Sequence, residues 1–163
     1  MIMKLKRCKN IYIFALANYL IQNMEVNHWK LQKLLYYAHA KHLVDFKESL
    51  AAAQVEAWEK GPIFRTLFDK LKDHDSKEII TNPIPCSMRG QQLNASRLQV
   101  LNFVMEKYGW VDSKELMRQA INKLPCQQYY ESPLPGYFPK VCVIPDIAIY
   151  QYFKKPENWH EFS

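Results

Sequence analysis

Two histidines and an aspartate come nearest to a catalytic or metal-binding pattern in this chain. His39, His42 and Asp45 recur at intervals of three residues, a spacing that a metal site on one helix can use. On a helical wheel, however, His42 falls in the middle of an apolar face, whereas Asp45 lies well round the helix from His39. The H-E-x-x-H pattern of zinc hydrolases does not occur. We therefore interpret both histidines as buried, hydrogen-bonded side chains and expect no metal or other cofactor.

Other common catalytic patterns are also missing from the sequence. The four glycines form neither G-x-x-x-x-G-K nor G-x-G-x-x-G, so no phosphate-binding loop of these kinds is present. The four cysteines are scattered without a C-x-x-C pair, which predicts reduced thiols in a cytoplasmic protein. No spacing indicates a cysteine–histidine nucleophile. We therefore expect that the protein is not an enzyme.

A row of hydrogen-bonding side chains lies on the same helix as the histidines. Gln32, Tyr36 and His39 are spaced at i, i+4 and i+7, so they line one edge of the apolar face. Buried polar groups are costly unless each finds a partner. Two interpretations follow. The row is either an internal network that locks the helix against its neighbours or a recognition groove for a partner.

The helix that positions this row is predicted from an N-cap at Asn27 to about Phe46. Apolar side chains cover nearly all of its circumference, which predicts a central helix packed on several sides. Its clearly solvated strip is expected to consist of Lys30, Lys33 and Lys41.

The residues after this helix indicate a strand, a turn and another helix. Residues 54–58 alternate as a short strand does, with residues 79–81 as the expected partner strand. Gly61-Pro62 is expected to begin the next helix, because proline fits the first helical position. The positive end of that helix would suit a carboxylate. Trp58 is either a core anchor or part of one binding surface with the polar row.

The whole pattern predicts a mainly α-helical protein. We expect a single domain over residues 1–163, built as a compact bundle of about six helices with a small two-stranded β element. The remaining helices are predicted at residues 8–23, 94–108 and 113–123 and after Pro145, with an irregular segment at 127–143.

Three short motifs, KLQKLLYYA, EAW and GPI, together resemble the Panacea domain family, the SocA-like antitoxins, which include phage-associated GepA-like proteins. KLQKLLYYA at residues 30–38, EAW at 56–58 and GPI at 61–63 occur in the family's order and at plausible spacing. The resemblance covers residues 11–73 best. Where the family carries a histidine and a tryptophan, this chain has Ile121 and Cys126, so no role is transferred to those two positions.

The resemblance implies an antitoxin that neutralises a cognate toxin by direct protein contact. It further implies a toxin encoded by an adjacent gene and, as an additional expectation, delivery of that toxin to a protease. Together with the polar row, it predicts these partner-binding residues: Gln32, Tyr36, His39, Glu56, Trp58, Gly61 and Pro62.

The charge of the chain supports an alternative. Its formal net charge is +6 and its pI about 9.1, with the densest basic cluster formed by Lys4, Lys6, Arg7 and Lys9. Such a charge suits a nucleic-acid-binding regulator of a phage-derived or mobile element. No apolar run approaches the roughly 20 residues of a membrane span, so we expect no membrane association.

Overall fold

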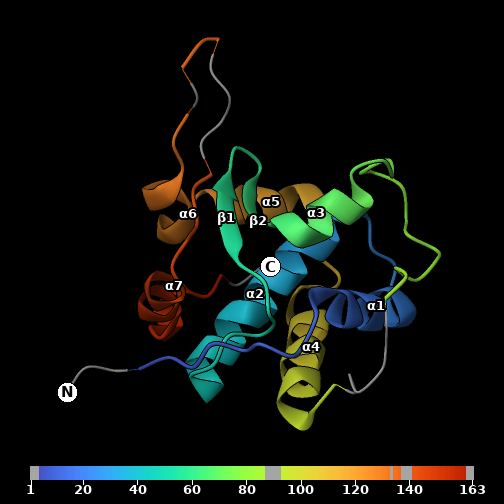
Figure 1. Ribbon diagram of the computed structural model, residues 1–163, viewed down its shortest axis with the longest axis horizontal. Coiled ribbons are helices and arrows are strands. Elements are labelled where there is room, and N and C mark those ends of the chain that lie inside the picture. The colour runs from blue at the N-terminus through green and yellow to red at the C-terminus, as the bar shows by residue number, and fades with distance from the viewer. Residues whose placement is uncertain (1–3, 87–92, 133, 137–140, 161–163) are drawn as a thin grey trace.

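A long central helix, α2 (His28–Phe46), organises the molecule, and most of the other elements pack against it (Figure 1). The structure is a computed structural model that describes residues 4–86, 93–132, 134–136 and 141–160. The other helices within these ranges are α1 (Ile13–Asn23), α3 (Arg65–Leu71), α4 (Ala95–Tyr108), α5 (Ser113–Ile121), α6 (Leu124–Tyr129), α7 (Asp146–Phe153) and the 3-10 helix η1 (Pro156–Asn158). The prediction of a mainly α fold with a small β element is confirmed.

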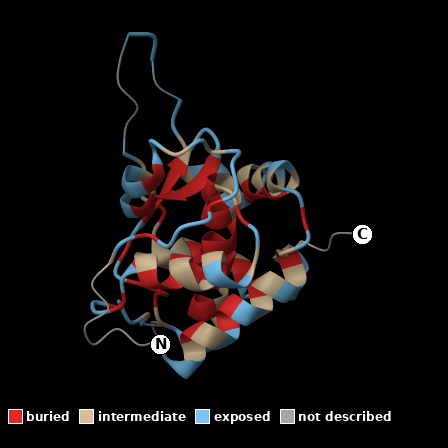
Figure 2. Ribbon diagram, turned by 90° about the vertical axis from the view of Figure 1, so that its right-hand side faces the viewer, coloured by how far each residue is buried: buried red, intermediate tan, exposed pale blue. Residues whose placement is uncertain are grey.

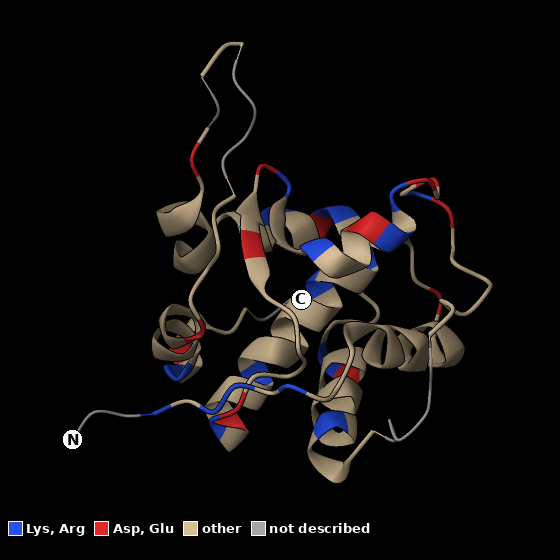
Figure 3. Cartoon of the chain, in the orientation of Figure 1, with Lys and Arg blue, Asp and Glu red and all other residues tan. Residues whose placement is uncertain are grey.

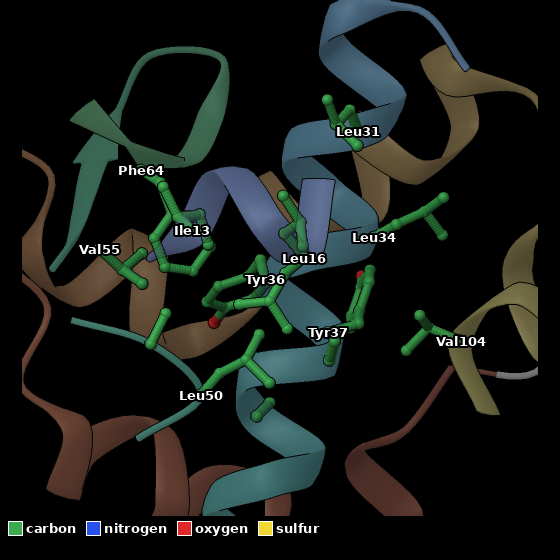
Figure 4. Close-up of a cluster of buried hydrophobic side chains, with 14 of the residues drawn as sticks. Ile13, Leu16, Leu31, Leu34, Tyr36, Tyr37, Leu50, Val55, Phe64 and Val104 are labelled. Carbon is green, nitrogen blue, oxygen red and sulfur yellow. The ribbon is translucent and has the colours of Figure 1, made fainter. Parts of the chain in front are cut away.

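The boundaries and burial of α2 follow from its sequence. The side-chain oxygen of Asn27 accepts a hydrogen bond from the Lys30 amide at 2.8 Å, as predicted for the N-cap. Every residue from 31 to 40 is buried, and side chains from α1, α4 and the strands converge on this stretch (Figures 2 and 4). A helix buried on all sides needs covering elements all round it, and the shorter helices supply them.

The two strands form a hairpin that differs from the predicted pairing. β1 (Val55–Trp58) pairs antiparallel with β2 (Gly61–Phe64), with Val55 opposite Phe64 and Trp58 opposite Gly61. The expected partner strand at residues 79–81 is therefore wrong, and Ile80 instead donates its amide to Val26 at 2.8 Å. The outer edge of β1 is covered by residues 142–144, through hydrogen bonds between Ala57 and Cys142 and between Ile144 and Val55.

The expected helix start at Gly61-Pro62 is also wrong, because these residues begin β2 and α3 starts at Arg65. Proline lacks a backbone donor, so it fits the beginning of a strand as well as that of a helix. Gly61 has a φ of +104°, which an L side chain rarely adopts. The carboxylate site expected at a helix end there has no basis.

Two further boundaries differ from the predictions. α1 begins at Ile13 rather than residue 8, because residues 6–11 are extended and hydrogen-bond to residues 47–52. α6 lies in a stretch expected to be largely irregular, and Pro125 stands in its first turn, where its missing N–H costs nothing. None of the described helices is long and apolar enough to cross a membrane.

The burial of α2 makes a direct prediction for Leu35, whose side chain is fully buried. We expect Leu35→Ala to lower the free energy of unfolding by about 2–5 kcal/mol, because it removes apolar contacts and leaves a cavity. Urea denaturation followed by circular dichroism measures this loss. Lys114→Ala on the exposed face of α5 is the control and should change stability by less than about 0.5 kcal/mol. A similarly small effect at Leu35 would contradict the packing described here.

Candidate functional site

The side chain of Gln32 joins α2 to the second strand of the hairpin. Its Oε1 accepts the Phe64 amide at 2.9 Å, and its Nε2 donates to the Phe64 carbonyl at 3.3 Å. The same Nε2 lies 3.2 Å from the Nε2 of His28. The fully buried amide of Gln32 therefore pairs with the backbone of Phe64 much as a neighbouring strand would.

Lys33, next in the sequence, fixes the start of the same strand from its place on α2. Its Nζ donates to the Pro62 carbonyl at 3.1 Å, and the side chain is fully buried. A Cβ at Gly61 would lie 3.1 Å from this Nζ, so glycine allows the close approach. The prediction that Lys33 lies in a solvated strip is wrong, because the hairpin covers it.

The environment of Lys33 is unfavourable for a charged amine. Burial lowers the pKa of Lys33 from 10.5 to about 7. An ammonium group has three donors, and among the described residues the Pro62 carbonyl accepts from one of them. The nearby Cys126 thiol is also buried, which raises its pKa to about 11, so it does not supply a ready counter-charge.

Tyr36 and Tyr37 contribute to packing rather than to an exposed surface. Both rings are fully buried, and Tyr36 meets Phe153 of α7 edge-on at a centroid distance of 5.9 Å. Among the described residues, neither hydroxyl has a hydrogen-bond partner. Burial raises the pKa of both phenols well above the ordinary value, so they stay neutral.

His39 ties α2 to the first turn of α7. Its Nδ1 accepts the Leu50 amide at 3.2 Å, so the ring proton lies on Nε2, which donates to Asp146 at 3.0 Å. Asp146 also accepts a hydrogen bond from Arg7 at 3.1 Å. Burial alone would raise the pKa of Asp146, but the bonds from His39 and Arg7 outweigh it and hold the pKa below its ordinary value.

His42, one turn further along α2, is held through both ring nitrogens, as expected for a core histidine. Its Nδ1 lies 2.7 Å from the Glu48 carbonyl and its Nε2 lies 2.9 Å from the Ser96 hydroxyl. Burial lowers the pKa of His42 to about 4, which keeps the ring neutral. Within the described ranges, no group of three or more histidine, cysteine or acidic side chains is arranged to hold a metal ion.

The polar row is therefore internal. Gln32, Tyr36 and His39 are each at most 1% exposed, and two of the three bind neighbouring elements through hydrogen bonds. The interpretation of this row as an accessible groove is therefore wrong. The alternative interpretation, an internal network that locks the helix against its neighbours, describes the geometry. Gly61 and Pro62 are buried as well, so these five predicted binding residues offer little surface.

The remaining two predicted residues, Glu56 and Trp58, belong to a partly exposed cluster on the outer side of the hairpin. Glu56 accepts hydrogen bonds from the Trp58 indole at 3.0 Å and from Arg65 at 3.1 Å. The Arg65 guanidinium lies 5.0 Å from the centre of the Trp58 ring, and the ring of Phe68 meets that of Trp58 at 4.7 Å. We call Glu56, Trp58, Arg65 and Phe68 the hairpin face.

The hairpin face was only partly visible in the sequence. Glu56 and Trp58 are two residues apart on one strand and so point to the same side. Arg65 and Phe68 were missed as its members, although their i, i+3 spacing places them on one side of a helix. Trp58 does not lie over the polar row, because its ring packs on Phe68 and Arg65 instead.

The two positions that depart from the family pattern lie beneath the hairpin. The Cys126 thiol is 3.9 Å from the Trp58 carbonyl, and an Ile121 carbon is 3.5 Å from the place of a Cβ on Gly61. Cys126 is buried, and Ile121 is half-buried. These residues therefore support the inner side of the hairpin and take no part in the hairpin face.

The buried amine of Lys33 predicts a specific pH dependence of stability. The unfolded chain holds this proton up to about pH 10.5, whereas the folded chain releases it near pH 7. Between these values the unfolded state binds more protons, so the free energy of unfolding should rise with pH. The full gap between about pH 7 and pH 10.5 corresponds to roughly 5 kcal/mol.

Urea unfolding of the wild type and Lys33→Met between pH 7 and pH 10 tests this. We expect most of the rise in the wild type to be absent from Lys33→Met, which lacks this buried amine, and present in the control Lys72→Met, whose side chain is exposed. Parallel pH profiles for the wild type and Lys33→Met would show that Lys33 is not buried in its neutral form.

Comparison with known proteins gives one family. The family model described as antitoxin SocA-like, Panacea domain, matches residues 31–123, more than half of the chain. This range includes most of α2, the whole hairpin and its contacts with Gln32 and Lys33. No solved structure matches.

A curated relative, antitoxin SocA from Caulobacter vibrioides (strain NA1000 / CB15N), is 33% identical over 75 residues. The matched part covers 43% of this chain and 40% of the relative. The match with the curated relative thus spans well under half of either protein. On the strength of the family match, the chain belongs to the antitoxin SocA-like, Panacea domain family.

Proposed function

We propose that this protein is an antitoxin that neutralises a toxin by direct contact, and that the hairpin face is the contact surface. The family and the name of the curated relative support the antitoxin role. The observation that carries the choice of surface is the partly exposed pair of Trp58 and Arg65 on a hairpin braced from within. Tryptophan and arginine are the residue types that most often dominate the energy of protein interfaces.

The hairpin face has the chemistry of an interface centre. Trp58 is half-buried, and the side chain of Arg65 is 45% exposed. Glu56 is only 6% exposed and holds both groups in place by hydrogen bonds. A partner can therefore bury one aromatic ring and one guanidinium without leaving the Glu56 carboxylate unpaired.

The support beneath the face lowers the cost of binding. Gln32 and Lys33 fix β2 to the central helix through three hydrogen bonds to its backbone. Ordering a flexible loop on binding would cost free energy, and a hairpin that is already fixed avoids most of that cost. The polar residues of α2 then act by positioning the hairpin rather than by touching the toxin.

We further propose which kind of partner the protein binds and how it acts on that partner. The toxin is a protein encoded by an adjacent gene, and delivery of the bound toxin to a protease is a second role. The action is binding without a catalytic step. The engaged ring nitrogens of His39 and His42 support this, because neither histidine has a free nitrogen for proton transfer in the described structure.

Co-expression with the product of the adjacent gene tests the proposal. We expect the wild type to restore growth and to co-purify with the toxin. Trp58→Ala and Arg65→Ala should each weaken binding by about 2 kcal/mol or more, roughly thirtyfold in Kd, with rescue reduced accordingly. Isothermal titration calorimetry measures the affinity, and circular dichroism checks the fold.

The chain offers matched controls away from the hairpin. Trp110 is 61% exposed, and the side chain of Arg118 is 59% exposed, so Trp110→Ala and Arg118→Ala remove the same side-chain types elsewhere. These controls should bind as tightly as the wild type. Equal binding by the hairpin variants and the controls would place the contact surface elsewhere, and a harmless neighbouring gene product would contradict the proposed partner.

A further inference from the structure

A second surface lies at the opposite end of the central helix from the hairpin. Residues 4–9 run as an extended segment beside the end of α2 (Figure 3). The segment is fixed there by its backbone. The Lys6 amide donates to Lys47 at 2.8 Å, the Ser49 amide donates to Lys6 at 3.0 Å, and the Cys8 amide donates to the Ser49 hydroxyl at 2.7 Å.

Basic side chains from three parts of the chain meet at this segment. Lys4, Lys6, Arg7 and Lys9 are exposed along it. Two more lysines, Lys47 after α2 and Lys154 after α7, lie over the same ring, that of Tyr150, at 5.1 and 5.9 Å. We call Lys4, Lys6, Arg7, Lys9, Lys47 and Lys154 the basic face.

The charge of the basic face is largely uncompensated. Apart from Arg7, none of its members forms an ion pair within the described part of the chain. The neighbouring carboxylates already have partners, and Arg7 is the one member of the basic face among these partners. Glu48 binds Arg97 at 3.0 Å, Asp45 binds Lys41 at 3.4 Å, and Asp146 binds both His39 and Arg7.

The cations around α3, in contrast, lie beside exposed carboxylates. Lys70 and Lys72 alternate with the exposed carboxylates Asp69 and Asp73 along the helix end, which divides the positive charge there. The basic face therefore carries the denser field of one sign, and such a field attracts an acidic partner over distances of about 10 Å.

We propose that the basic face binds the phosphate backbone of a nucleic acid duplex. Lys4 and Lys6 are alternate residues of the extended segment, about 6–7 Å apart, and Lys9 lies three residues further along, so these cations are spread along the segment rather than gathered at one point. Each strand of a duplex presents a phosphate every 3.4 Å or so, and a line of cations suits that linear polyanion.

Residues 4–9, which carry four of the six cations, favour a nucleic acid over a membrane. Proteins that lie on membranes add exposed apolar side chains to their basic residues. In residues 4–9, the apolar side chains are Leu5 and Cys8, which are half-buried and buried. Phosphate contacts alone carry no sequence information, so the binding is independent of base sequence.

The basic face and the hairpin face are separate sites. Lys33 beneath the hairpin and Lys47 in the basic face are fourteen positions apart along α2 and its end, about 21 Å of helix. In Figure 1 the hairpin lies in the upper part of the view, and residues 4–9 run below it beside the far end of α2. A toxin and a nucleic acid can therefore be bound by one molecule together, and loss of one activity leaves the other measurable.

The test compares two variants of the full-length protein that lose the same charge. The first carries Lys4→Gln, Lys6→Gln, Lys9→Gln and Lys154→Gln, all exposed members of the basic face. The control carries Lys60→Gln, Lys70→Gln, Lys72→Gln and Lys77→Gln, which are exposed at the hairpin turn and around α3. Fluorescence anisotropy with a short labelled DNA duplex gives Kd between about 50 and 200 mM NaCl.

We expect the wild type to bind with an affinity that falls steeply with salt, by a slope of about −4 in a log–log plot. The first variant should bind at least about tenfold more weakly, with a slope reduced by about three, while the control keeps the slope of the wild type. Circular dichroism should show both variants folded.

Three results would overturn the proposal. One is no binding of the duplex by the wild type. Another is an equal loss in the two variants, which would make binding a matter of net charge alone. The third is binding to phosphatidylserine vesicles or to polyglutamate as tight as binding to the duplex, which would show a general anion surface rather than a nucleic-acid site.

Discussion

The fold depends on how one buried amide side chain pairs with the backbone of a strand. Gln32 offers its oxygen and nitrogen to the amide and carbonyl of Phe64, and so closes the inner edge of the hairpin against α2. Without this pairing, a polar side chain and two backbone groups would be buried without partners, at a cost of about 1–3 kcal/mol each. Lys33 adds a hydrogen bond to Pro62 although burial disfavours its charge. The hairpin is thus fixed where it would otherwise be a two-stranded unit of marginal stability.

This arrangement gives the motifs that resemble the family a structural meaning. KLQKLLYYA supplies Gln32 and Lys33, and GPI supplies the backbone that Lys33 contacts, with Gly61 allowing the close approach. The motifs therefore specify how the hairpin is mounted. The outward residues Arg65 and Phe68 stand outside the motifs. Recognition of the motifs identifies the scaffold better than it identifies the partner.

The sequence predicted correctly those features of the fold that depend on residues close together in the chain. Asn27 caps α2 because its side chain reaches an amide three residues away, and the apolar circumference of α2 follows from its composition. The burial of Lys33 could not be read in this way, because the covering hairpin is almost thirty residues distant. Gly61-Pro62 fits a helix start and a strand start equally well, and pairing with β1 decides between them.

In the candidate site, too, features set by nearby residues were predicted, whereas contacts between distant elements were not. Glu56 and Trp58 were predicted from the motif, whereas the contact of Trp58 with Phe68 and Arg65 depends on where α3 begins. His42 was correctly predicted as a core histidine because it lies on the apolar face. The polar row allowed two interpretations, since spacing alone does not reveal which element covers a helix edge. The hydrogen bonds of Gln32 and His39 distinguish them.

Native-state hydrogen exchange at the Phe64 amide tests the central claim most directly. In the wild type, this amide should be protected nearly as well as that of Val104, which reports on the core of α4. In Gln32→Met, the protection of Phe64 should fall by at least about tenfold relative to that of Val104, because the amide loses its acceptor. Equal ratios of protection in the two proteins, or rapid exchange of Phe64 in the wild type, would contradict the account of a hairpin held to α2 by Gln32.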